Sequence, residues 1–221
     1  MADRVFEDRV GLWVVDAARG VARRSAIKAF AGGLIRDVFL PRTSTPTQFA
    51  AIRQVGLNAH LWSAVDGLAA GDYVARFLAD KARLNPGAAE LNIELGSDAP
   101  LPTYVEAVVR GIRAHLPRYR LRINLGGWKG FATPAELLDG DPNLYVCEQA
   151  YLGNMDELLS PADVLAELLD YGAPRAQATV CYAADCTVLG SPTRLRTLPD
   201  LRRLHRGLIY QDDLMADAGL L

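Results

Sequence analysis

The stretch AELNIELGSD, residues 89–98, decides the fold that we expect from the sequence. Aliphatic residues at positions 91, 93 and 95 alternate with Asn92 and Glu94, and the chain then turns polar at Gly96. Alternation with a period of two is typical of a β-strand. In parallel α/β sheets and barrels, ligands and catalytic groups gather at the carboxyl ends of the strands. Glu94 is therefore the first candidate for a functional residue.

Strand-like and helix-like segments alternate along the rest of the chain. Buried strands are predicted at 11–16, 36–40, 57–63, 119–125, 143–149, 176–183 and 207–211, in addition to the opening stretch. Helical periodicity or helix start and stop signals occupy 23–31, 45–55, 68–84, 104–116, 133–138, 160–171 and 198–205.

Eight strands alternating with helices predict an α/β fold, a (β/α)8 TIM-type barrel, with residues 1–221 as a single domain. A doubly wound open sheet is the alternative. That fold would normally carry a glycine-rich phosphate loop, G-x-G-x-x-G, after its first strand. The segment after the first predicted strand begins DAARG, at positions 16–20, and lacks this motif. The barrel is therefore the preferred prediction.

Composition excludes several classes of function. The formal net charge of -2 does not favour nucleic-acid binding, which requires a concentrated basic surface. The three cysteines are too few and too unevenly spaced for a disulfide framework or a structural zinc site. The charged start MADRVFEDRV is unlike a signal peptide, and no apolar run is long enough to span a bilayer. We expect a soluble protein, located in the cytoplasm or in a virion, without a bound cofactor or metal.

In a barrel of this kind, the residues at the mouth are those at the carboxyl ends of the strands, so the predicted strands identify them. Acids, amides and aromatic rings dominate, and histidines are nearly absent. This mixture favours carbohydrate over phosphate, because carboxylates and amides bind sugar hydroxyls and aromatic rings cover the apolar faces of sugars. The candidate substrate-binding residues are Asn92, Asn124, Trp62, Trp128, Tyr151, Gln211 and Asp212.

Three carboxylates are the candidate catalytic groups. Cleavage of a glycosidic bond needs one carboxylic acid that protonates the leaving oxygen and a second carboxylate that acts as nucleophile, base or electrostatic partner. Glu94 is assigned as the acid, and Asp16 and Glu148 compete for the second role. Each of these side chains has a structural alternative, because an acid at the end of a strand often caps the next helix or pairs with arginine.

The positions of these acids resemble those of the family 25 lysozymes, phage-type barrels that cleave the glycan of peptidoglycan. That family carries an acid at the end of the first strand and an Asp-x-Glu at the end of the fourth, where the Glu is the proton donor. Asp16 matches the first feature, and Asn92-Ile93-Glu94 matches the second with Asn in place of Asp. The resemblance implies a barrel that acts on a cell-wall glycan, with Glu94 as its general acid.

Two hypotheses follow. The first is a glycosidase in which Glu94 works with Asp16 or Glu148. The second is a non-catalytic barrel that binds the host surface or builds part of a bacteriophage tail, because Asn92 cannot ionise and so removes one charge of the family pattern. Other virion tail proteins would then be its partners. A divalent metal held by Asp16, Glu94, Glu148 and Asp212 is a third alternative without a spacing motif to support it.

Overall fold

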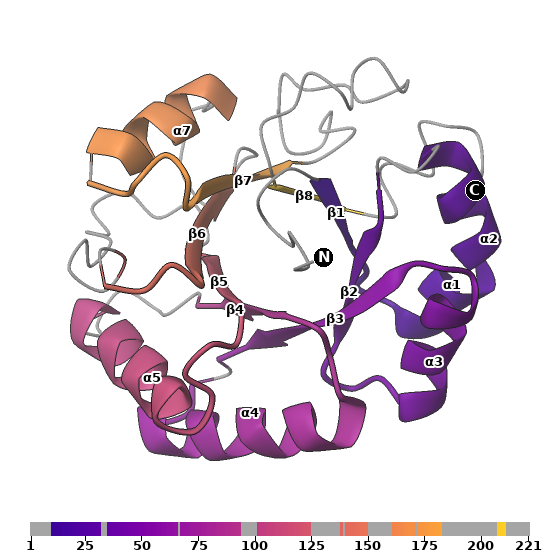
Figure 1. Ribbon diagram of the computed structural model, residues 1–221, viewed down its shortest axis with the longest axis horizontal. Coiled ribbons are helices and arrows are strands. Elements are labelled where there is room, and N and C mark those ends of the chain that lie inside the picture. Colours follow the sequence, from indigo (N-terminus) through magenta and orange to yellow (C-terminus); the bar gives the residue numbers. More distant parts are fainter. Residues whose placement is uncertain are drawn as a thin grey trace.

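The computed structural model describes residues 10–31, 35–65, 67–93, 101–124, 138, 140–149, 161–170, 172–182 and 207–210. Within these residues the strands form one parallel sheet in which each strand pairs with the next and β8 pairs with β1. The sheet is therefore closed, and Figure 1 looks into the ring of strands. The strands are β1 (Val10–Trp13), β2 (Asp37–Pro41), β3 (Asn58–Ala64), β4 (Ala89–Asn92), β5 (Leu121–Asn124), β6 (Leu144–Gln149), β7 (Ala178–Tyr182) and β8 (Gly207–Tyr210).

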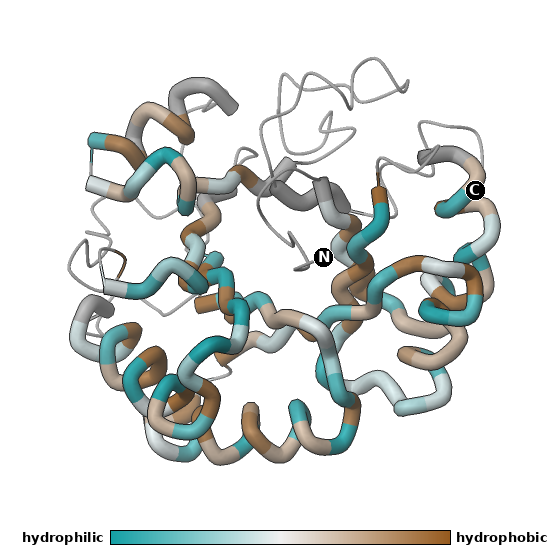
Figure 2. Tube along the Cα trace, viewed as in Figure 1, coloured by the Kyte–Doolittle hydropathy of each residue, from teal (hydrophilic) through white to brown (hydrophobic). Residues whose placement is uncertain are grey.

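Helices surround this sheet on the outside (Figure 1). The described helices are α1 (Ala17–Ala22), α2 (Arg24–Ala31), α3 (Pro46–Gln54), α4 (Ala70–Leu84), α5 (Leu101–His115) and α7 (Pro161–Asp170). They carry both hydrophobic and hydrophilic residues, as the mixed colours in Figure 2 show. The predicted α/β class with a parallel barrel-type sheet is thus confirmed. Residues 133–137 of the helix predicted at 133–138 lie outside the described residues, as does the helix predicted at 198–205.

Local sequence signals explain where α3 begins and where α4 ends. The Thr45 hydroxyl accepts a hydrogen bond from the Gln48 N–H, and the Gln48 side chain accepts one from the Thr45 N–H, which forms a capping box. Pro46 follows at the first helical position, where no N–H is needed. At the end of α4, Asn85 adopts a left-handed conformation with φ of 47° and terminates the helix.

One predicted element is wrong in its extent. The segment 11–16 was expected to be extended throughout, but β1 ends at Trp13 and α1 begins at Ala17. The cause is Asp16, whose carboxylate accepts hydrogen bonds from the N–H groups of Ala18 and Arg19. A side chain that binds the first N–H groups of a helix stabilises the helix over continued strand.

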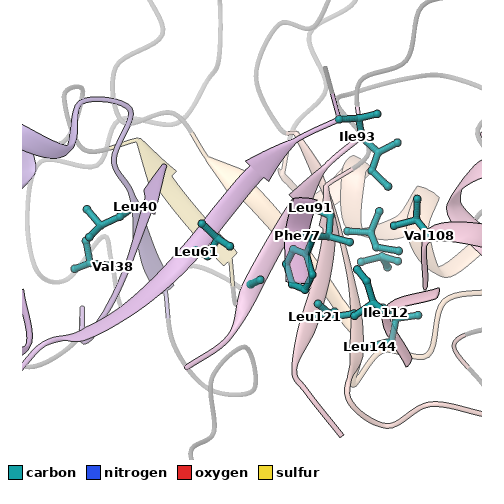
Figure 3. Close-up of a cluster of buried hydrophobic side chains, with 14 of the residues drawn as sticks. Val38, Leu40, Leu61, Phe77, Leu91, Ile93, Val108, Ile112, Leu121 and Leu144 are labelled. Atoms are coloured by element: carbon teal, nitrogen blue, oxygen red, sulfur yellow. The ribbon is translucent and has the colours of Figure 1, made fainter. Parts of the chain in front are cut away.

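The main hydrophobic core lies between the strands and the helices. Leu91 and Ile93, predicted to face the helices, belong to this core and are almost completely buried. Figure 3 shows Phe77 of α4 and Val108 and Ile112 of α5 among these strand residues. Alternate residues of the strands therefore point outward into an apolar layer, as a barrel with covering helices requires.

Helices α4 and α5 pack closely at Gly111 of α5. A Cβ atom at this position would lie 2.8 Å from Cγ2 of Val74 in α4, a distance that real Cβ atoms essentially never show. Gly71, in the first turn of α4, has open space around the equivalent position. Packing therefore requires glycine at position 111 and not at position 71, which makes Gly71 a suitable control.

We predict that Gly111→Ala lowers the free energy of unfolding by about 1–3 kcal/mol, because the added methyl group overpacks the helix contact. Gly71→Ala should leave stability unchanged or raise it by about 0.4–1 kcal/mol, since alanine reduces the entropy of the unfolded chain. Urea unfolding of both variants measures the difference. Equal stability of the two variants would contradict the close contact at Gly111.

Candidate functional site

The interior of the barrel is polar and aromatic, in contrast to the apolar layer outside the strands. Its residues alternate along each strand with members of the main core. A small cluster of Trp13, Phe39, Ala88, Tyr145 and Cys147, with Trp62 packed against it, is separate from that core. The buried polar residues of the strands are Asp37, His60, Ser63, Glu90, Asn92, Arg122, Asn124 and Thr179.

An ion pair between β4 and β5 is buried in this interior. Arg122 donates from Nε and Nη2 to Oε2 of Glu90, at 3.1 and 2.6 Å. Asn124 donates from Nδ2 to Oε1 of the same carboxylate, at 3.1 Å. The side chains of Glu90 and Arg122 are 0% and 1% exposed. Both carboxylate oxygens of Glu90 are therefore used by protein donors.

The same guanidinium extends the interior network toward β2 and β3. The Cζ atom of Arg122 lies 5.0 Å from the centre of the Phe39 ring, a cation–π distance. The Phe39 ring lies 4.9 Å from the His60 ring. His60 in turn places Nε2 3.0 Å from Oδ1 of Asp37, which also accepts a hydrogen bond from Nδ2 of Asn58 at 2.8 Å. A carboxylate can only accept, so His60 donates to Asp37 from Nε2.

Two tryptophans from β1 and β3 form the aromatic part of the interior. The rings of Trp13 and Trp62 meet edge to face, with centroids 5.1 Å apart. Nε1 of Trp62 donates to the Val14 carbonyl at 2.8 Å, which fixes the orientation of its indole. Trp13 is buried, whereas Trp62 is partly exposed. Trp62 therefore presents ring surface to solvent, as an aromatic sugar platform requires.

Three of the predicted site residues belong to this interior. Asn92 and Asn124 are buried and are register partners on β4 and β5, and Trp62 lies on the adjacent strand β3. Asp16 is exposed and caps α1 with its carboxylate. The backbone of Glu148 belongs to β6, paired with Val180. Glu94, Trp128, Tyr151, Gln211 and Asp212 lie outside the described residues.

The sequence reasoning missed the residues one layer deeper in the barrel. Glu90 stands two positions before Asn92, and Arg122 stands two positions before Asn124, so each shares a strand face with a residue that was identified. Extending the period-two alternation toward the start of each strand would have found both. Asp37 and His60 follow from the same rule applied to β2 and β3. The predicted site residues were all taken from the ends of the strands and therefore did not include this layer.

Other chemical features of the described residues lie away from the barrel interior. Burial raises the pKa of the Tyr104 and Tyr119 phenols, and both donate a hydrogen bond to a backbone carbonyl, of Leu68 and Pro86 respectively. The described part of the chain contains no group of three or more His, Cys, Asp or Glu residues arranged to hold a metal ion. Its helices are all too short or too polar to cross a membrane.

Fold and site together define a parallel α/β barrel with a polar interior that contains a buried ion pair. The sequence matches no family model and no curated protein. Solved structures nevertheless share the fold. A candidate chitinase A from Streptomyces coelicolor aligns with a TM-score of 0.58 and 13% identity, over 97% of this chain and 95% of the other.

Two further structures extend this likeness. Active domain 2 of a thermostable chitinase from Pyrococcus furiosus aligns with a TM-score of 0.60 and 8% identity, over 91% of this chain and 83% of that domain. The spore cortex-lytic enzyme SleL from Bacillus cereus aligns with a TM-score of 0.55 and 15% identity, over 82% of this chain. The alignment spans about half of SleL, 51%. The chain is therefore similar in fold to glycan-hydrolase barrels.

We predict a strong energetic coupling between Glu90 and Arg122. Glu90→Leu or Arg122→Met alone should lower the free energy of unfolding by about 3–5 kcal/mol, because each leaves an uncompensated buried charge. The double variant Glu90→Leu/Arg122→Met should lose much less than the sum of the two, since no buried charge remains.

Urea unfolding of the wild type, both single variants and the double variant measures this coupling. Additive losses in the double variant would show that the two side chains do not depend on each other, against the ion pair described above.

Proposed function

We propose that this protein is a glycoside hydrolase-like barrel that acts on a cell-wall glycan, with Glu94 as the general acid. The proposal includes the complete (β/α)8 architecture, with residues 1–221 as one domain. The observation that carries it is the position of Asn92, which lies in the polar interior at the carboxyl end of β4 while Leu91 and Ile93 face the helices. Glu94 follows two residues later in the sequence, and barrels place their catalytic groups at the carboxyl ends of the strands.

The likeness in fold to two chitinases and a cortex-lytic enzyme supports the glycan as substrate class. In the proposed reaction Glu94 protonates the glycosidic oxygen, and Asp16 or Glu148 serves as the second carboxylate. Asn92, Asn124, Tyr151, Gln211 and Asp212 orient hydroxyls, and Trp62 and Trp128 cover the faces of the sugar rings. The proposed reaction needs no cofactor.

A non-catalytic glycan-binding barrel is the second candidate, and two observations favour it. The described strand residues hold two buried acids that face the interior, Asp37 and Glu90, and each is hydrogen-bonded to a side chain that can carry positive charge. Asn92, between positions 90 and 94, carries no charge. A barrel without a second ionised carboxylate near Glu94 would retain sugar binding through Trp62 while losing hydrolysis. This version accommodates a structural or host-binding role in a bacteriophage tail.

We predict that Glu94→Gln reduces the release of reducing ends from peptidoglycan or chitin oligomers by about 10²–10⁴-fold, the usual contribution of a general acid. Binding of the same oligomers should persist in this variant, because the amide keeps the size of the side chain. Oligomer binding without hydrolysis by the wild-type protein would instead identify the non-catalytic barrel. Neither hydrolysis nor oligomer binding by the wild type would contradict both candidates.

The role of Asp16 is separable from its helix cap. Asp16→Asn preserves the cap, because Asn and Asp are equally good at this position, whereas Asp16→Ala should cost about 0.5–2 kcal/mol of stability. If Asp16 is the second carboxylate, Asp16→Asn loses hydrolysis while its unfolding curve stays that of the wild type. Hydrolysis retained in Asp16→Asn would assign the second role to Glu148, which Glu148→Gln tests in the same assay.

The tail-protein version makes its own prediction about location. Mass spectrometry of purified phage particles, from a phage whose genome encodes this chain, should detect it as a virion component alongside other tail proteins. Its absence from particles in which other tail proteins are detected would exclude that version.

A further inference from the structure

A pocket lies at the end of the barrel opposite the proposed glycan site. It has a volume of about 500 Å³ and is formed by the second half of α5 with the turn after it, and by the segment that leads into β6. Both segments precede strands, so the pocket sits at the amino ends of β5 and β6. It is lined by Val109, Arg110, Arg113, Pro117, Arg118, Gly140, Asp141, Pro142 and Asn143.

The charge of this lining is predominantly positive. Three arginines, Arg110, Arg113 and Arg118, face one described carboxylate, that of Asp141. Arg113 donates from Nε to the Asp141 carboxylate and from Nη1 to the carbonyls of Leu116 and Tyr119. These bonds hold its guanidinium in a fixed orientation at the wall of the pocket. Its remaining nitrogen, Nη2, is buried and has no acceptor among the described residues.

The other two arginines remain available to a ligand. Arg110 pairs with Glu106 one turn earlier in α5, but their side chains are 72% and 40% exposed, and an exposed pair of this kind contributes little to stability. Arg118 is exposed and has no hydrogen-bond or ion-pair partner in the part of the chain that the structure describes. Both guanidiniums can therefore turn toward an anion without breaking a strong interaction.

We propose that this pocket binds an oxyanion, a phosphate or carboxylate group of a small molecule or of a polymer segment. Guanidinium groups present parallel N–H donors that match the oxygens of these two groups. Arg110 and Arg118 bind the anion, and the fixed guanidinium of Arg113 adds positive charge at the wall. Pro117 and Pro142 supply apolar surface for the rest of the ligand. The proposal is independent of the glycan-cleaving function, because no residue of the proposed catalytic site lines the pocket.

Titration calorimetry at low ionic strength tests this site with three probes: pyrophosphate, inorganic phosphate and a trimer of galacturonate. We expect saturable binding of one equivalent of at least one probe. Arg110→Gln/Arg118→Gln should weaken this binding at least tenfold, equal to about 1.4 kcal/mol. The control variant Arg36→Gln/Arg53→Gln removes the same charge from exposed positions near β2 and on α3, and should keep the wild-type affinity.

The probes also distinguish the source of the oxyanion. Preference for pyrophosphate or phosphate identifies a phosphate ligand, and preference for the galacturonate trimer identifies a carboxylate ligand. Amide NMR shifts of Gly140, Asp141 and Asn143 in the wild-type protein should change with the same affinity, which keeps the test valid if a variant fails to fold. The proposal is overturned if no probe saturates, or if the control variant loses as much affinity as Arg110→Gln/Arg118→Gln.

Discussion

The ion pair between Glu90 and Arg122 constrains the rest of the barrel interior. Desolvation of two charges costs more than their attraction returns unless the remaining hydrogen-bond positions are filled. Here Asn124 fills the second oxygen of Glu90, and Phe39 covers the face of the guanidinium. The pair therefore links β4 and β5 directly and reaches β2 through the aromatic ring. These bonds also set the register of two adjacent strands, because a slip of one residue would turn Glu90 into the apolar layer.

This constraint has a consequence for chemistry at the mouth of the barrel. Glu90 lies on the same strand face as Asn92, but both of its oxygens are occupied, so it is not free to act on a substrate. Negative charge for glycosidic cleavage must then come from other residues, and Glu94, two positions after the end of β4 in the sequence, is the proposed one. The interior thus separates a lower layer of hydrogen-bonded side chains, which includes the Glu90–Arg122 pair, from the position where a general acid is proposed. A glycan binder and a glycan hydrolase can share this lower layer, and they differ in whether a second ionised carboxylate stands above it.

The sequence predicted the outward face of the barrel better than its interior. Leu91, Ile93 and the periodic residues of α5 carry a strong alternating or helical pattern, since burial against a neighbouring layer selects apolar side chains at a fixed spacing. The end of β1 was not predictable in this way, because an aspartate after an apolar run can be the last residue of a strand or the cap of the next helix. Here the Asp16 carboxylate accepts hydrogen bonds from the Ala18 and Arg19 N–H groups and caps α1. The Glu90–Arg122 pair was missed for a related reason. Its partners are 32 residues apart, and nothing local in the sequence signals that they meet.

The two ends of the barrel differ in the charge of their candidate binding residues. At the carboxyl ends, the candidate residues are acids, amides and aromatic rings, and the Arg122 guanidinium in the layer below them is paired with Glu90. At the amino ends of β5 and β6, three arginines share one described carboxylate in the lining of the pocket. An anionic ligand would be attracted to the second end, while a neutral glycan would find the aromatic surface of Trp62 at the first. A polymer that carries both neutral sugars and acidic groups could therefore contact both ends without competition between them, because the two sets of residues do not overlap.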